Sequence, residues 1–181
     1  MRKFALDTNC IIDLEEDRPA ATFVREIVQA WRAGRIELAV VAVSASENQK
    51  SGIASRTFVE FERKLENVGL AEVAHLLPLM KWDIFYWDHA LWSNDEMANL
   101  ATAIQGVLFP NTKLEAPDNI EKNSIWRNRQ CDVLTAWAVA FHKWGCLVTS
   151  DTNFHDHKAE LQELGIMELL RPQEAAQLCR P

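Results

Sequence analysis

The sequence has few cysteines, and their spacing argues against the frameworks usually built on them. The four cysteines are far apart and include no Cys-x-x-Cys pair. A disulfide scaffold or a structural zinc site is therefore not expected, and reduced thiols in the cytoplasm are the default. The cysteines are Cys10, Cys131, Cys146 and Cys179.

Long apolar runs are also missing from the sequence. No run reaches the ~20 residues that a transmembrane helix needs. The N-terminal segment MRKFALDTNC becomes acidic too early for a secretory signal. We therefore expect a cytoplasmic protein that has no membrane segment.

Positive charge and glycine are in short supply as well. The net charge of −7 argues against a protein that is held on nucleic acid by bulk charge alone. It leaves open a protein that binds phosphates through metal ions, because clustered acids would add to the negative count. The 6 glycines form no phosphate-binding loop, and no Ser-His-Asp order is present.

The chain does contain a regular alternation of short apolar runs and helical segments. The length of 181 residues and the 48% hydrophobic content suit one domain over residues 1–181. Apolar strands are predicted in KFALD, IELAVVAVS, CLVTS and IMELL, and a third strand falls in either VAHLLPL or, as we favour, WDIFYWD. Helices are predicted in CIIDLEE, 20–33, 55–67, 94–106, DVLTAWAVAFHKW and HKAELQEL, and RPQEAAQL closes the chain. This order predicts an α/β fold with three α/β/α layers around a central parallel sheet.

One segment resembles a linker. Residues Phe109 to Asn123 contain two prolines, three asparagines and few apolar residues. We interpret this segment as a loop insertion within the domain and not as a boundary between two domains.

Four acids follow or precede strands in a way that would bring them together. Asp7 follows the first strand, Glu47 follows the second in VSASEN, and Asp151 follows CLVTS. Asp132 opens the helix that leads into CLVTS, so we expect it at the same edge of the sheet. Ligands of open parallel sheets bind at the carboxyl ends of the strands, and four carboxylates would meet there.

Such a cluster needs a cation. Like charges at close range raise the pKa of each carboxyl group, whereas a divalent ion lowers it again. Hard oxygen ligands suit Mg²⁺ or Mn²⁺, and two such ions can promote phosphodiester cleavage by activating water and stabilising the leaving oxygen. We expect Thr8, Asn9 and Thr149 to support the carboxylates, and Asn153 to be either a neutral ligand or a group that supports the ligands.

The motifs LDTN, SASEN, CDVLTAWAVA and TSDTNF resemble the four acidic motifs of PIN domains. This family contains metal-dependent ribonucleases, including VapC-type toxins that are inhibited by a protein antitoxin. The resemblance implies that the metal is bound by Asp7, Glu47, Asp132 and Asp151, with Asn153 at a position that often holds a further acid. The excess length over a small toxin falls mostly within 105–130. Homodimers are compatible with such a domain, although the residues mark no interface.

A tryptophan and two arginines precede the third acidic motif. Trp126, Arg127 and Arg129 lie in IWRNR. They would suit single-stranded RNA, through base stacking and phosphate contacts. A half-buried Trp126 beside two solvated arginines is the equal alternative.

Several plainer interpretations remain open. Each aspartate taken alone is an ordinary cap or turn residue. Asp13 is expected to face solvent or the rim of the site, and Glu60 and Glu62 are substitutes for Glu47 that we expect to be solvated. His155 and His157 are expected on an exposed loop and not as ligands.

Two other functions share these residues. A haloacid-dehalogenase-like phosphatase also has an aspartate after its first strand, but it needs a second aspartate where this chain has Asn9. A degenerate PIN domain would bind RNA or a partner protein without catalysis.

Overall fold

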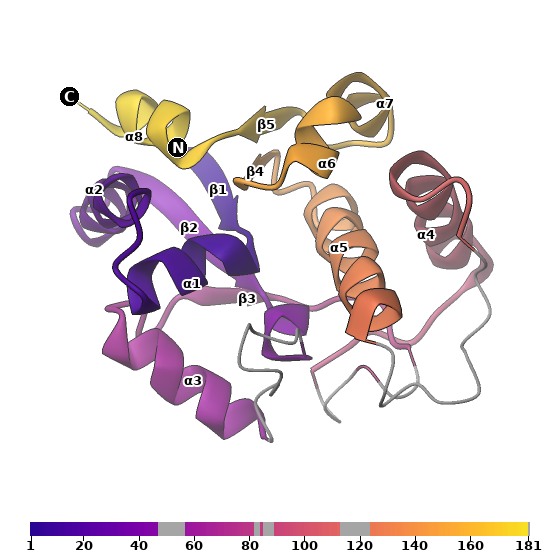
Figure 1. The fold of residues 1–181 in the computed structure, drawn as a ribbon, viewed down its shortest axis with the longest axis horizontal. Coiled ribbons are helices and arrows are strands. Elements are labelled where there is room, and N and C mark those ends of the chain that lie inside the picture. The colour runs from indigo at the N-terminus through magenta and orange to yellow at the C-terminus, as the bar shows by residue number, and fades with distance from the viewer. Residues whose placement is uncertain (47–56, 82–83, 85–88, 113–123, 181) are drawn as a thin grey trace.

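A computed structural model describes residues 1–46, 57–81, 84, 89–112 and 124–180. Glu47 and most of WDIFYWD lie outside these residues. The described chain forms helices on both faces of a single sheet, as Figure 1 shows.

The sheet has five strands, and each neighbouring pair is parallel. The strand order is β3-β2-β1-β4-β5. The strands are β1 (Arg2–Leu6), β2 (Ile36–Val41), β3 (Ala74–Leu76), β4 (Cys146–Val148) and β5 (Glu168–Leu170). The predicted α/β fold with a central parallel sheet is confirmed.

The register aligns the ends of the three central strands. Leu6, the last residue of β1, is paired with Val40 of β2 and with Val148 of β4. The residues that follow these strands therefore leave the sheet at one edge, which is where open parallel sheets bind ligands.

Alternate side chains of β1 enter two separate cores. Phe4 and Leu6 pack into one apolar cluster, whereas Ala5 lies in the other. This alternation follows from the period of two residues along a strand. Both faces are therefore buried, which explains why the strands are almost continuously apolar.

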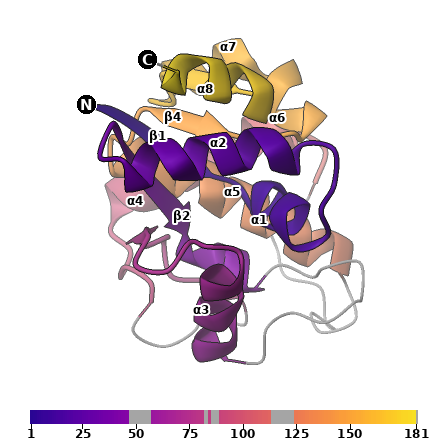
Figure 2. The same ribbon diagram turned by 90° about the vertical axis from the view of Figure 1, so that its left-hand side faces the viewer.

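Four helices cover the face that contains Phe4. They are α1 (Thr8–Glu15), α2 (Ala21–Arg32), α3 (Phe58–Asn67) and α8 (Pro172–Cys179). Figure 2 shows α2 beside α8 and α1. The predicted helix at 20–33 is confirmed by α2.

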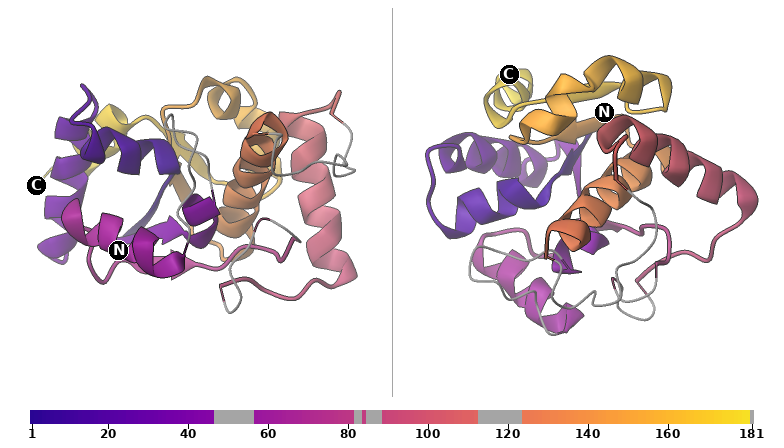
Figure 3. Two further views of the ribbon diagram at one scale, coloured as in Figure 1. Left: turned by 60° about the horizontal axis from the view of Figure 1, so that its bottom comes forward. Right: turned by 45° about the vertical axis from the view of Figure 1, so that its right-hand side comes forward.

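The opposite layer consists mainly of α4 (Asp95–Leu108) and α5 (Ser124–Phe141), which pack against each other. The short helices α6 (Thr152–Asp156) and α7 (Lys158–Glu163) adjoin them, and the 3₁₀ helix η1 (Ala42–Ser46) follows β2. Figure 3 shows α4 and α5 side by side from two directions. The predicted 105–130 insertion thus contributes to both long helices, and its residues 113–123 lie outside the described part.

The favoured position of the third strand was wrong. The structure places β3 in VAHLLPL, where Ala74–Leu76 pair with the end of β2. Of WDIFYWD only Ile84 is described, and it lies in a turn. An edge strand of three residues with little alternation carries almost no sequence signal.

The start of the long apolar helix was also predicted too late. Helix α5 begins at Ser124, so Asp132 lies inside the helix and does not open it. Trp126 and Gln130 are four residues apart and both are buried, so the buried face of the helix continues into a segment that looks polar. No helix of the described chain is long and apolar enough to span a membrane.

Candidate active site at the carboxyl edge of the sheet

Asp7 lies where β1 passes into α1. Its backbone N–H donates to the carbonyl of Val148 over 3.0 Å, which continues the ladder between β1 and β4. Its side chain is the N-cap of α1 and accepts from the backbone N–H of Thr8 over 2.7 Å. Asp7 is only 5% exposed, so the fold holds a carboxyl group away from water at the end of its central strand.

Two neutral side chains cross-link Asp7 to the segment after β4. The hydroxyl of Thr149 donates to Oδ2 of Asp7 over 2.6 Å. The carboxamide of Asn9 donates to the same Oδ2 over 2.7 Å and to Thr149 Oγ1 over 2.9 Å. Asn9 Oδ1 in turn accepts from the backbone N–H of Ser150 over 3.2 Å. Asp7 is therefore fixed by residues from both strand ends.

Asp151 joins the same hydrogen-bond network through Thr149. Its backbone N–H donates to Thr149 Oγ1 over 3.0 Å. Its side chain caps α6 by accepting from the backbone N–H of Asn153 over 2.8 Å. A single hydroxyl group thus bonds the carboxylate of Asp7 and the backbone of Asp151. The structure brings the first and last predicted acids together.

The electrostatics of Asp7 agree with this geometry. Burial raises the pKa of Asp7 from its ordinary value of 3.8 to about 6, against the lowering effect of the hydrogen bonds from Thr149 and Thr8. The charge of Asp151 raises the pKa of Asp7 further. A hard cation would oppose both effects, because it stabilises the ionised carboxylates.

The oxygen donors of this network suit such a cation. Oδ1 of Asp7 accepts one hydrogen bond from the described residues, so a lone pair remains for a ligand. Carboxylate oxygens are the ligands that Mg²⁺ and Mn²⁺ prefer. The described residues nevertheless contain no group of three or more His, Cys, Asp or Glu side chains placed to hold a metal. Metal binding by the full set of acids stays a prediction.

Of the other two predicted ligands, Asp132 lies within the described residues and Glu47 does not. Asp132 is partly buried on α5, a helix that contacts both β4 and η1. Glu47 follows η1 and lies outside the described residues. Of its substitutes on α3, Glu62 is exposed and Glu60 is partly exposed.

Thr8 supports the site differently from the expectation. Its backbone N–H, and not its hydroxyl, bonds Asp7. The hydroxyl donates to Ser44 Oγ over 2.8 Å and thereby links α1 to η1. The start of α1 is thus tied to the segments after β2 and β4.

The segment after Asp151 is more ordered than an exposed loop. Asn153 directs its amide to the carbonyl of Leu108 over 3.2 Å, which joins α6 to the end of α4. The rings of His155 and His157 bond the backbone carbonyls of Thr149 and Asn153 over 2.9 and 3.0 Å. The prediction of an exposed loop at these histidines was wrong, because α6 folds them back onto the backbone.

Asp13 was also expected in a more solvated place. It is 6% exposed on α1, and the Nη1 atom of Arg18 lies 3.8 Å from its Oδ1. Burial raises the pKa of Asp13 in spite of this arginine. No signal in the sequence distinguished it from the exposed acids that follow.

The structure favours the packing interpretation of Trp126. The residue is 6% exposed and belongs to the core on the α4 and α5 side, so its ring is not presented for stacking on a base. Arg127 and Arg129 are partly buried on the same helix. Trp126 carries Lys81 over its ring at 5.3 Å from the centroid, a neighbour that sequence reasoning missed.

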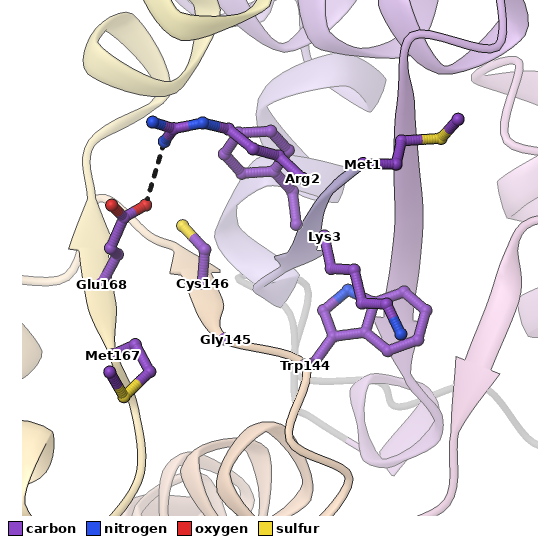
Figure 4. A pocket seen from close by; sticks show the side chains of 9 residues that line it. Met1, Arg2, Lys3, Trp144, Gly145, Cys146, Met167 and Glu168 are labelled. Carbon is purple, nitrogen blue, oxygen red and sulfur yellow. Dashed lines mark hydrogen bonds and ion pairs between the residues drawn. The ribbon is translucent and has the colours of Figure 1, made fainter.

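A hollow lies at the edge of the sheet opposite to Asp7. It has a volume of about 370 Å³ and is shown in Figure 4, at the amino ends of β1 and β4. Arg2 pairs with Glu168 over 3.2 Å, and Lys3 lies 5.1 Å from the centroid of the Trp144 ring. Burial raises the pKa of the Cys146 thiol to about 12, which makes it a poor nucleophile.

Scans against protein-family models, curated proteins and solved structures found no match to this chain. Its chemistry is inferred from the residues themselves.

Proposed function

We propose that this protein is a metal-dependent endoribonuclease of PIN-like architecture, which hydrolyses phosphodiester bonds in RNA. The observation that carries the proposal is the pairing of Asp7 and Asp151. These acids follow adjacent parallel strands, share the hydroxyl of Thr149, and interact electrostatically. The resemblance of LDTN and TSDTNF to acidic PIN motifs supports nuclease chemistry for this pair.

The proposed ligands of Mg²⁺ or Mn²⁺ are Asp7, Glu47, Asp132 and Asp151, with Asn153 as a neutral group nearby. A divalent ion bound there would activate a water molecule and offset the charge that develops at phosphorus. The protein contributes orientation. Thr149 and Asn9 hold one oxygen of Asp7, so the other oxygen would be offered to a bound ion in a fixed position. Burial of Asp7 strengthens its attraction to a cation, because little water competes.

Cleavage of a labelled single-stranded RNA tests the proposal. Asp7→Asn and Asp151→Asn are each expected to abolish the cleavage that Mn²⁺ supports, and chelation by EDTA is expected to abolish it in the unmodified protein. Asp156→Asn is the matched control, because it removes the same charge from an exposed position on α6. Cleavage at the unmodified rate by Asp7→Asn would falsify the mechanism.

The proposal extends to a toxin role in the cytoplasm. The four free, buried cysteines suit a reducing compartment. A toxin of this kind would arrest growth when it is expressed alone, and a small antitoxin encoded beside it would restore growth. Growth that continues at the normal rate, with active enzyme present, would remove the toxin role and leave the nuclease assignment in place.

Asn9 argues against the phosphatase alternative. It occupies the position of the second aspartate, and its amide donates to Asp7 and Thr149. A carboxamide cannot serve as the general acid that such a phosphatase needs there. Hydrolysis of small phosphate esters is therefore expected to be absent. RNA binding without Mn²⁺ binding in calorimetry would instead identify a degenerate domain.

A further inference from the structure

In most ion pairs of the described chain, the carboxylate that pairs with the lysine or arginine lies at the surface. Arg25 with Asp17, at 2.6 Å, is typical, and Arg180 with Glu26 at 3.1 Å is similar. Such cations have their charge largely balanced within the fold. Lys81 and Arg129 are held differently, by neutral groups.

Lys81 is placed by two residues of α5. Its ammonium group donates to Oε1 of Gln130 and lies 5.3 Å from the centroid of the Trp126 ring. Gln130 is 1% exposed and is itself bonded to Gln105 of α4 over 3.3 Å. Among the described residues no carboxylate forms an ion pair with Lys81. Its partial burial lowers the pKa of Lys81, which indicates a charge that lacks compensation.

Arg129, which directly precedes Gln130 in the sequence, is held in a similar way. Its Nη1 atom donates to Thr112 Oγ1 over 2.9 Å, and its guanidinium carbon lies 5.5 Å from the centroid of the Phe109 ring. The described carboxylates form no ion pair with this arginine either. Each cation therefore lies near an aromatic ring and is oriented by a neutral oxygen, so its charge remains available to an anion.

Both cations lie on the side of the sheet where the acids meet. Helices α4 and α5 run antiparallel, since Trp137 bonds the Met97 carbonyl over 3.0 Å while Gln130 bonds Gln105. The first turns of α5 are therefore beside the end of α4, and α5 leads back to the start of β4. Lys81 follows the carboxyl end of β3 by five residues. Asp132 lies on the same helix, two residues after Gln130.

We propose that Lys81 and Arg129 bind phosphate groups of single-stranded RNA and guide the strand toward the acidic site. This inference rests on the proposed function. A chain of net charge −7 repels RNA at long range, so contact requires local cations that the fold has not already neutralised. Because Gln130 and Thr112 already restrict these long side chains, less conformational entropy is lost when RNA binds.

RNA affinity at several salt concentrations tests the inference. Lys81→Met and Arg129→Met are made in an Asp7→Asn background, so that RNA is not cleaved during the measurement. Each is expected to weaken binding several-fold at low salt. Each is also expected to reduce the slope of log affinity against log salt by about 0.7, the value for one phosphate contact on a single strand. Arg25→Met is the matched control, since its cation is already paired with Asp17.

Conservative variants separate charge from packing. Lys81→Arg and Arg129→Lys are expected to keep most of the affinity. Lys81→Gln keeps a donor for Gln130 and replaces Lys81→Met if the latter fails to fold. The loss is expected on RNAs of unrelated sequence, because phosphate contacts carry no base information. Affinity and salt slope that match those of the control would overturn the inference, as would a loss confined to one sequence.

The two proposals fail in different ways. If Asp7→Asn abolishes cleavage while folded Lys81 and Arg129 variants bind RNA like the control, only the phosphate contacts are refuted. If Asp7→Asn still cleaves RNA, the nuclease assignment itself is refuted.

Discussion

Thr149 donates a hydrogen bond to Asp7 over 2.6 Å, although the two residues are 142 positions apart in the sequence. Neither residue is exposed by more than a few per cent. The bond exists because β1 and β4 are neighbours and end in register. The pKa and the orientation of the Asp7 carboxyl group therefore depend on the segment after β4, which carries both Thr149 and Asp151.

The hydroxyl of Thr149 is expected to tune the affinity of Asp7 for metal. Thr149→Val keeps the shape of the side chain but removes a hydrogen bond that lowers the pKa of Asp7. Mn²⁺ affinity in calorimetry should fall by about 10- to 100-fold, as for other groups that orient metal ligands. Thr149→Ser should restore most of it. Equal affinity in the valine variant would show that the hydroxyl serves packing alone.

The metal-free protein is expected to lose stability as the pH rises from 4 to 6. The pKa of Asp7 is raised to about 6 in the fold from an ordinary value of 3.8. The folded state therefore binds this proton more tightly than the unfolded state does. The stabilisation that the proton provides is complete below pH 3.8 and is lost as the pH rises through about 6. The shift corresponds to about 3 kcal/mol at most.

Urea unfolding at a series of pH values measures this effect. The comparison is between the unmodified protein and Asp7→Asn, because other groups contribute equally to both. The difference in unfolding free energy should change between pH 4 and 6 and be flat above pH 7. A constant difference over the whole range would contradict the raised pKa.

Mn²⁺ is expected to raise the melting temperature more at pH 7.5 than at pH 5. Binding requires ionised carboxylates, and the acid with a pKa near 6 is mostly protonated at the lower pH. Differential scanning fluorimetry with and without EDTA gives the shift directly. Asp7→Asn should show little shift at either pH, and an equal shift in that variant would place the ion elsewhere.

Asn9→Asp is expected to destabilise the metal-free protein by about 1–3 kcal/mol. The change converts a donor to Asp7 into a second carboxylate that faces it. Mn²⁺ should recover part of the lost stability, because a cation offsets the added charge. Asn9→Ala is the companion variant, since it removes the donor without adding charge. A smaller loss for Asn9→Asp than for Asn9→Ala, without metal, would contradict this account.

The parts of the site that could be predicted are those with local signals. Asp7 and Asp151 each end a short apolar strand in Asp-Thr-Asn, and parallel strands bring such ends to one edge. The bonds from Asn9 and Thr149 depend on the register of β1 against β4, which the two segments do not encode separately. Their supporting role could be expected, whereas their partners could not.

Other features depended on contacts between distant segments. Helix α5 extends back to Ser124 because Trp126 is buried in the core and Gln130 is bonded to Gln105 of α4. The polar residues of this stretch conceal both features from sequence reasoning. Nothing in the residues around Lys81 marks it as a partner of α5. The short β3 is recognisable mainly through its pairing with β2.

The central position of β1 has a consequence for biosynthesis. The strand is synthesised before both of its neighbours, and the helices α1 to α5 lie between it and one of them, β4, in the chain. Asp7 and Asp151 cannot meet until that late strand docks, because contacts distant in sequence form only after the intervening chain has been closed. The pairing of these two acids is therefore absent from every nascent chain that is too short to include β4.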